Sequence, residues 1–177
     1  MGSKRVGLAR TQALLQNLKR ELTNGSAKSR VFTSNQPQYS TYVFKYDTDS
    51  DAKTAAEHTL KDPDGNVLNL PAGFVITCGW VEVVETVTST GSATIIVGTQ
   101  GTSADPNGFV TSIGKASLGA NSIHPFDGAL VHNGSNSAAA VAKRIHTTDD
   151  PVSITIGTAA LTAGKFYVYV QGYHSLG

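Results

Sequence analysis

The hydrophobic period of this chain changes near Tyr39, and that change limits the folds available to it. Before Tyr39 the leucines recur at helical spacing and form one apolar stripe, which comprises Leu8, Leu14, Leu15, Leu18 and Leu22. After Tyr39 apolar and polar residues alternate with a period of two, as in half-buried strands. We therefore expect a helical arm and linker over residues 1–38 and a β domain over residues 39–177.

The predicted helix, about Leu8 to Leu22, carries the positive charge of the chain. Seven of the fourteen basic side chains and one of the thirteen acidic ones lie in the first thirty residues, so that segment has a net charge of +6 and the remainder −5. Asn24-Gly25 is a helix stop, and residues 23–38 are expected to be a linker or extended arm. The candidate docking residues are Lys4, Arg5, Leu8, Arg10, Leu15, Leu18, Lys19, Arg20 and Leu22.

Three roles are open for this helix: packing on its own body, docking on another subunit, or binding nucleic acid. A helix that only grips phosphates does not need regularly spaced leucines, so nucleic acid is not the expected partner. Docking on another subunit is the favoured interpretation, because leucines at heptad spacing let helices pair or enter a groove.

The body shows several short strands separated by turn signals, a pattern typical of a sandwich or a barrel. Expected strands are Tyr39–Tyr46, Gly73–Cys78, Trp80–Val87 (separated from the preceding one by Gly79), Ala93–Thr99, a run with Val152, Ile154 and Ile156, and a last strand with Phe166, Val168 and Val170 on one face. Tyr167, Tyr169 and Gln171 lie on the other face of that last strand. Residues 47–65 read as a polar loop, residues 98–134 have no assignable pattern, and residues 137–146 fit either a helix or a strand.

Composition narrows the class of protein. Charged residues make up 15% of the chain, against roughly 25% in typical soluble domains, which suits a surface partly covered by neighbouring subunits. The single cysteine, Cys78, excludes an intrachain disulfide and is expected to be a buried structural thiol. No apolar run approaches the roughly 20 residues of a membrane span, and no secretory signal peptide is expected after Arg5.

The aspartates Asp47, Asp49 and Asp51 open like a calcium-binding loop. Such a loop needs glycine at its sixth position and glutamate at its twelfth, where this chain has Ala52 and His58. A solvated acidic loop is therefore expected, with no metal and no cofactor.

No catalytic constellation is visible, and we expect no enzymatic activity. Glu82 and Glu85, the pair considered for glycoside chemistry, are predicted on opposite faces of a strand, and Asp149 and Asp150 in a loop. Tyr167, Tyr169 and Tyr173 are candidates for a sugar-stacking face, but such stripes are more often core or subunit interface.

Two stretches resemble a known group of proteins in their order of elements. The first, LPAGFVITCGWVEVVETVTSTGSATIIVGTQGTSADPNGFVTSI, runs from Leu70 to Ile113, and the second, VSITIGTAALTAGKFYVYVQGY, from Val152 to Tyr173. Together they resemble small jelly-roll virion structural proteins of tailed bacteriophages, many of the capsid decoration or cement type. The segment KRVGLARTQALLQNLKREL is similar to the leading segments of short phage virion proteins.

The resemblance implies a mainly β fold, a jelly-roll-like β-sandwich preceded by a basic amphipathic arm. It also implies a capsid decoration (cement) protein, whose partner is the major capsid protein and whose place is the virion, assembled in the host cytoplasm. The alternatives are a head-fibre or tail-tip module that contacts host glycans through its loops, and a jelly-roll shell subunit. A homo-oligomer is expected, first a homotrimer, with Tyr167, Tyr169 and Gln171 at the subunit interface, because interfaces favour tyrosine over lysine and glutamate.

Overall fold

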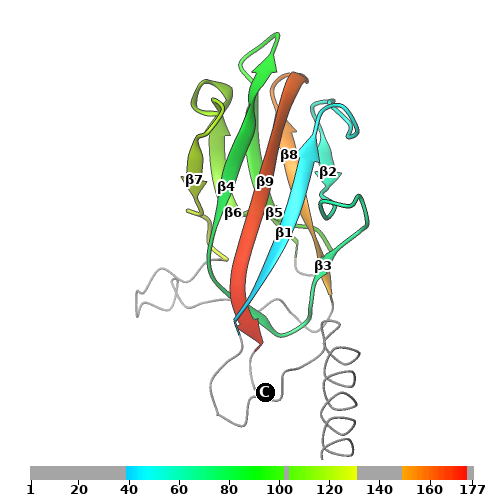
Figure 1. The fold of residues 1–177 in the computed structure, drawn as a ribbon, viewed down its shortest axis with the longest axis vertical. Helices are drawn as coiled ribbons and strands as arrows, with labels where there is room; N and C mark the ends of the chain where they lie inside the picture. The colour runs from blue at the N-terminus through cyan, green and yellow to red at the C-terminus, as the bar shows by residue number, and fades with distance from the viewer. Residues whose placement is uncertain (1–38, 102–103, 131–148, 175–177) are drawn as a thin grey trace, which may run out of the picture. The chain divides into compact units, whose positions relative to one another are not determined.

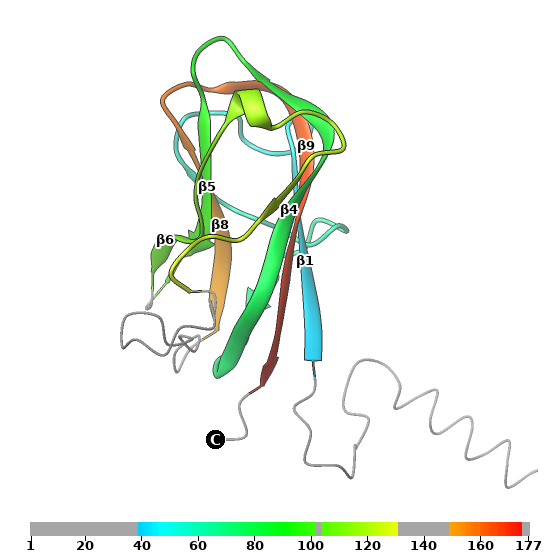
Figure 2. The same ribbon diagram turned by 90° about the vertical axis from the view of Figure 1, so that its left-hand side faces the viewer.

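A computed structural model describes residues 39–101, 104–130 and 149–174. These residues form two antiparallel sheets packed face to face (Figures 1 and 2). The first sheet contains, in spatial order, β1 (Tyr39–Asp47), β9 (Leu161–His174), β4 (Phe74–Ser89) and β7 (Ile123–Pro125). The second contains β2 (Glu57–Thr59), β8 (Asp150–Gly157), β5 (Thr94–Thr99) and β6 (Asp105–Gly114), and β3 (Asn69–Leu70) pairs with β8. A single 3-10 turn, η1 (Lys115–Ser117), precedes β7 within this part of the chain.

The order of the strands is that of a jelly roll. With the two-residue β3 set aside, the chain crosses from one sheet to the other at every connection except the β5–β6 hairpin. The first and last strands are neighbours in one sheet, and the strands next to them in sequence meet in the other. Eight strands in two interleaved sheets are the jelly-roll arrangement, so the predicted fold is confirmed.

The core lies between the two sheets and follows the predicted alternation. Phe44, Tyr46, Phe166, Val168 and Val170 of the first sheet are buried against Ile95, Val97, Val152, Ile154 and Ile156 of the second. Tyr46 stacks on Phe166 with ring centroids 5.0 Å apart. The hydroxyl of Tyr46 has a hydrogen-bond partner, because it donates to the Ala52 carbonyl at 2.9 Å.

Two expectations about strand limits were wrong, and a third stretch had no assignment. Gly79 does not separate two strands, because β4 runs unbroken from Phe74 to Ser89. A side chain at position 79 would meet the Phe126 ring and the Tyr169 carbonyl, so glycine permits a close approach there rather than a break. The polar stretch after Asp47 contains β2, and the stretch left unassigned contains β6 and β7.

Several predictions fall on residues outside the described part of the chain. They are the helix of residues 8–22, the linker that follows it and the ambiguous segment of residues 137–146. The division of the chain at residue 38 therefore stays a prediction. In the part that the structure covers, no helix is long and apolar enough to cross a membrane.

Candidate interaction face

The aromatic residues Tyr167 and Tyr169, which the sequence indicated as candidates, lie on the outer face of the first sheet. Tyr167, Tyr169 and Gln171 alternate with the buried residues of β9 and are half-buried on this outer face. In the register of the sheet Tyr169 lies between Val43 on β1 and Trp80 on β4, and Trp80 lies opposite Pro125 on β7. We call the face formed by Val43, Trp80, Tyr167, Tyr169, Pro125 and Ile123 the aromatic face. Ile123, at its β7 end, is 63% exposed.

The rings of the aromatic face hold one another in place. Tyr169 and Trp80 stack at 5.0 Å with their planes 15° apart, and Tyr167 is tilted against Tyr169 at 6.4 Å. One face of both stacked rings is thereby covered, which leaves less flat surface for a sugar than separate rings would offer. Cross-strand aromatic pairs of this kind also stabilise the sheet itself.

Two charged residues, Lys45 on β1 and Glu82 on β4, lie opposite Tyr167 on either side, and the Glu82 carboxylate acts directly on a ring hydroxyl. Partial burial, and after it the neighbouring Glu82 carboxylate, raise the pKa of Tyr169 above its ordinary value. The phenol is therefore neutral at physiological pH and retains its proton as a hydrogen-bond donor.

The two glutamates of β4 lie on the same side of the sheet, contrary to the prediction. Glu82 lies opposite Tyr167, and Glu85 lies opposite Lys165, two residues along β9 on the same face. A register shift between Val83 and Glu85 accounts for this, since one extra residue in a bulge reverses the faces that follow it. No alternation rule applied to the sequence alone reveals such a bulge.

Cys78 is exposed, so the expectation of a buried thiol was wrong. A register shift between Ile76 and Cys78 moves the cysteine to the outer face, where it pairs with Gln171. Its Sγ donates to Gln171 Oε1 at 3.1 Å, and Gln171 Nε2 donates to Thr41 Oγ1 at 3.2 Å. Gln171 thus connects β4, β9 and β1 next to the aromatic rings, which is a structural role.

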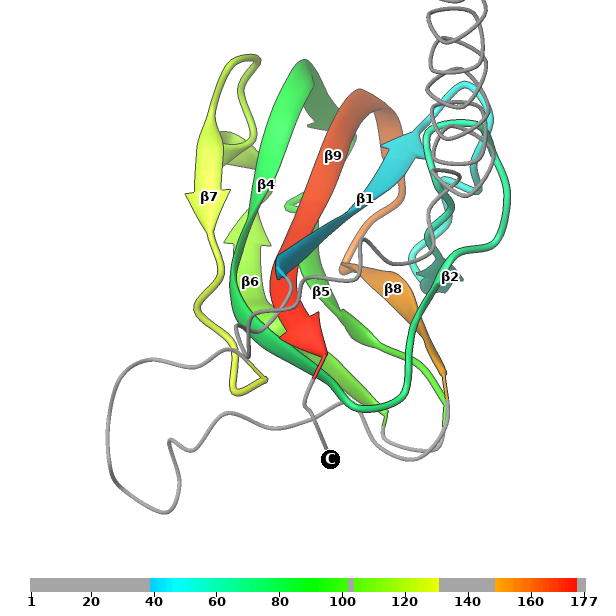
Figure 3. The same cartoon turned by 60° about the horizontal axis from the view of Figure 1, so that its bottom comes forward.

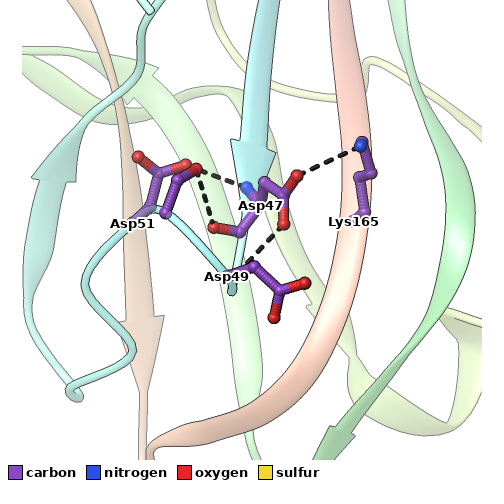
Figure 4. Close-up of polar contacts among 5 residues, drawn as sticks. Asp47, Asp49, Asp51 and Lys165 are labelled. Carbon is purple, nitrogen blue, oxygen red and sulfur yellow. Dashed lines mark hydrogen bonds and ion pairs between the residues drawn. The ribbon is translucent and has the colours of Figure 1, made fainter.

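Of the three aspartates that resemble a calcium loop, Asp47 and Asp51 have carboxylates bound to the protein, and Asp49 takes part through its N–H (Figure 4). Asp47 Oδ1 accepts the Asp49 N–H at 3.0 Å, its Oδ2 pairs with Lys165 Nζ at 3.1 Å, and Asp51 Oδ2 accepts the Asp47 N–H at 2.9 Å. The Asp49 N–H, and then Lys165, hold the pKa of Asp47 below its usual value. Among the described residues no cluster of histidine, cysteine and carboxylate side chains could hold a metal ion.

The expectation that Asp149 and Asp150 both lie in a loop was wrong for the second residue. Asp150 begins β8 and is 1% exposed, whereas Asp149 Oδ1 accepts the Ala72 N–H at 2.9 Å. Sequence reasoning also missed the contribution of Trp80 to the aromatic face. The signal was present, since Trp80 alternates with the buried Val81 along β4. The nine predicted docking residues of the arm lie outside the described residues.

Comparison with known proteins supports the fold. The sequence matches no protein-family profile and no curated protein. A chain of the capsid asymmetric unit of cyanophage Pam1 superposes with a TM-score of 0.55 at 17% identity, over 84% of this chain and 96% of that one. This likeness establishes a shared fold.

Two further solved structures score lower. A chain of the capsid of Helicobacter pylori bacteriophage KHP30 has a TM-score of 0.46 at 16% identity, over 78% of this chain and 93% of that one. A chain of the disulfide-linked pili that form Bacillus endospore appendages has 0.38 at 17% identity, over 84% of this chain and 100% of that one.

Proposed function

We propose that this protein is a non-enzymatic virion structural protein, a capsid decoration (cement) protein that docks on a phage head and stabilises it. The observation that carries the proposal is the jelly-roll body, which matches a chain of a phage capsid over 96% of that chain's length. The aromatic face agrees with a role in assembly, because tyrosine and tryptophan are enriched where protein surfaces meet.

In this proposal the arm anchors the protein and the body bridges shell subunits. A protein that binds the assembled shell but not its separated subunits stabilises the shell by mass action. The major capsid protein is the proposed partner. Neither a cofactor nor a reaction is needed for this function.

The test is binding to purified phage heads that lack this protein. A cement protein should saturate the heads at a fixed number of copies and raise the temperature at which they release DNA. A matched arm-less variant, with residues 1–23 removed, should remain folded and fail to bind. Normal decoration by the arm-less variant would contradict the role of the arm, and no binding by the full chain would contradict the proposal.

The two components of the proposed anchor can be separated by salt. Leu15→Ala with Leu18→Ala should remove roughly 1.5–3 kcal/mol of burial per docked side chain, with little dependence on salt. Neutral replacements of Arg10, Lys19 and Arg20 should weaken docking less, since exposed ion pairs contribute about 0–1 kcal/mol each. That weakening should fade near about 0.5 M salt, where charges are screened within a few Å.

The same preparation distinguishes the alternatives. A head-fibre or tail-tip module should bind host cells or their glycans in the absence of heads. A shell subunit should assemble into closed particles without any other protein. Either outcome, obtained without binding to heads, would contradict the proposed function and favour the corresponding alternative.

A further inference from the structure

Three of the four sheet edges in the described body have features that hinder pairing with another strand. Along β6, the Asp127 carboxylate accepts the Thr111 N–H and hydroxyl, each at 2.8 Å, and the Phe109 carbonyl accepts the N–H groups of Asp127 and Gly128. The edge strand β7 has three residues and ends in Pro125, and the edge strand β2 has three residues. Short strands, proline and charged caps are the devices by which proteins prevent edge-to-edge pairing.

The remaining edge strand is β1, which lies beside β9 in the first sheet (Figure 3). Its residues 39–43 form a stretch without such protection. Lys45 donates its N–H to the Lys61 carbonyl at 2.7 Å, away from β9. Because alternate residues of an edge strand point the same way, the N–H and C=O groups of Tyr39, Thr41 and Val43 also point away from β9. Within the described residues none of them has a backbone partner on that side. This stretch contains neither a charge nor a proline, and Tyr39 is 67% exposed.

We propose that β1 pairs antiparallel with β1 of a second copy of this chain, about a two-fold axis at Thr41. In that register Thr41 faces Thr41 of the partner subunit, and Tyr39 and Val43 face each other twice. Threonine pairs and pairs of an aromatic with a β-branched residue are among the favourable cross-strand neighbours. About six backbone hydrogen bonds form, because the outward-pointing residues become the hydrogen-bonded pairs of an antiparallel ladder.

The sequence of the open stretch favours a second copy over an unrelated strand, because the stretch is complementary to itself. Its outer side chains read Tyr, Thr, Val, so a two-fold axis at the centre opposes unlike residues at both ends and places no like charges together. The ladder is also limited in length. The Lys61 carbonyl already accepts the N–H of Lys45, and Pro37, which would lie opposite Lys45 in this register, has no N–H to donate. The pairing would join the aromatic faces of two copies, and it does not depend on the virion assignment.

The first test blocks the edge while keeping the backbone hydrogen bonds between β1 and β9. Thr41→Pro removes an N–H that points away from β9, and proline is tolerated at such edge positions. Sedimentation of the full chain should show half the mass of the parent protein, with thermal unfolding of the body retained. Thr41→Val keeps the N–H and should keep the parent mass. An unchanged mass for a folded Thr41→Pro variant would overturn the proposal.

The second test retains every N–H and depends on the register. Thr41→Lys and Thr41→Glu each place like charges across the proposed axis, so each alone should have half the parent mass. Mixing the two should restore the parent mass as a one-to-one pair of variants. Parent mass for either variant alone, or no pairing on mixing, would show that Thr41 does not face itself.

The third test maps the axis by cross-linking in a Cys78→Ser background. Thr41→Cys should form an intermolecular disulfide under mild oxidation, because the paired Cα atoms would lie about 5.5 Å apart, within the disulfide range. Tyr39→Cys should not, since it would face Val43 of the partner subunit. Equal cross-linking at both positions would overturn the register. Cross-linking of Thr41→Cys only to a head protein would show that the edge receives a different partner.

Discussion

A methyl group at position 79 has no space, so Gly79→Ala tests how closely the core-packed Phe126 ring approaches β4. Gly79→Ala would bring a Cβ against the Phe126 ring and the Tyr169 carbonyl, so we expect a loss of roughly 1–3 kcal/mol in the free energy of unfolding. Gly114→Ala meets nothing within 4 Å and should change stability by about 0.5 kcal/mol or less. Denaturant titration of both variants measures the difference, and equal stabilities would contradict the close approach.

The contacts of the Asp47 carboxylate, among them its ion pair with Lys165, should make the stability of the fold depend on pH. The pKa of Asp47 is lowered below 3.8, chiefly by the Asp49 N–H and then by Lys165. A carboxylate with a depressed pKa stabilises the fold at pH values above its unfolded pKa, and the contribution is lost as the pH falls through the folded pKa. Asp47→Asn keeps an acceptor for Asp49 but loses the charge, so we expect a cost of about 1 kcal/mol at neutral pH.

Thermal unfolding from about pH 7 to pH 2 checks this expectation. The difference between the parent protein and Asp47→Asn should be constant near neutrality and shrink below about pH 4. A difference that persists unchanged at pH 2 would show that the charge of Asp47 is not its source.

At the scale of single residues, the sequence was least informative about which face of the sheet a side chain occupies. Cys78 and Glu85 lie on the faces opposite to those predicted, because bulges in β4 precede each of them. A bulge is set by how two distant strands match in length and twist, and a local pattern carries no record of it. Alternation did place Tyr167, Tyr169 and Gln171 correctly on the outer face, since β9 has no register shift against β1.

At the scale of elements, β9 presents one face to the core and one to the surface, and neighbouring positions should differ sharply. Phe166 is fully buried, so Phe166→Ala should cost roughly 3–5 kcal/mol. Tyr167, half-buried on the aromatic face, should cost about 1 kcal/mol when replaced by alanine. Denaturant midpoints with unchanged slopes provide the comparison. A larger loss at Tyr167 would mean that the outer face carries a contact in the isolated protein.

Strands with a clean period of two were predictable, and strands without one were not. β1, β5, β8 and β9 alternate because each covers the core with one face. β2 has the sequence Glu-His-Thr, which contains no apolar residue and therefore shows no alternation. β6 begins with Asp-Pro-Asn-Gly, a sequence typical of turns. Tertiary pairing overrides local propensity in both strands.

At the scale of the whole molecule, self-association is expected through two surfaces, the aromatic face and the β1 edge, which share Val43. The outer face of β9 with Tyr167, Tyr169 and Gln171 was predicted to form a trimer, whereas the β1 edge is proposed to pair copies two by two. Tyr169→Lys places a charge among stacked rings and should reduce any association through that face, leaving the β1 pair intact. Sedimentation at tens of micromolar, within the range of weak specific affinities, separates the two effects. Equal masses for Tyr169→Lys and the parent would exclude the face as a contact in solution.

The position of β9 between β1 and β4 has a consequence for synthesis of the protein. The first sheet has no centre until the last strand has left the ribosome, since β1 and β4 each pair mainly with β9. Formation of this sheet must therefore wait until β9 has been synthesised, and it depends on contacts between residues far apart in sequence, which form slowly. A nascent chain would expose its apolar strands throughout translation, and a premature stop before residue 161 would leave aggregation-prone fragments instead of a shortened but usable protein.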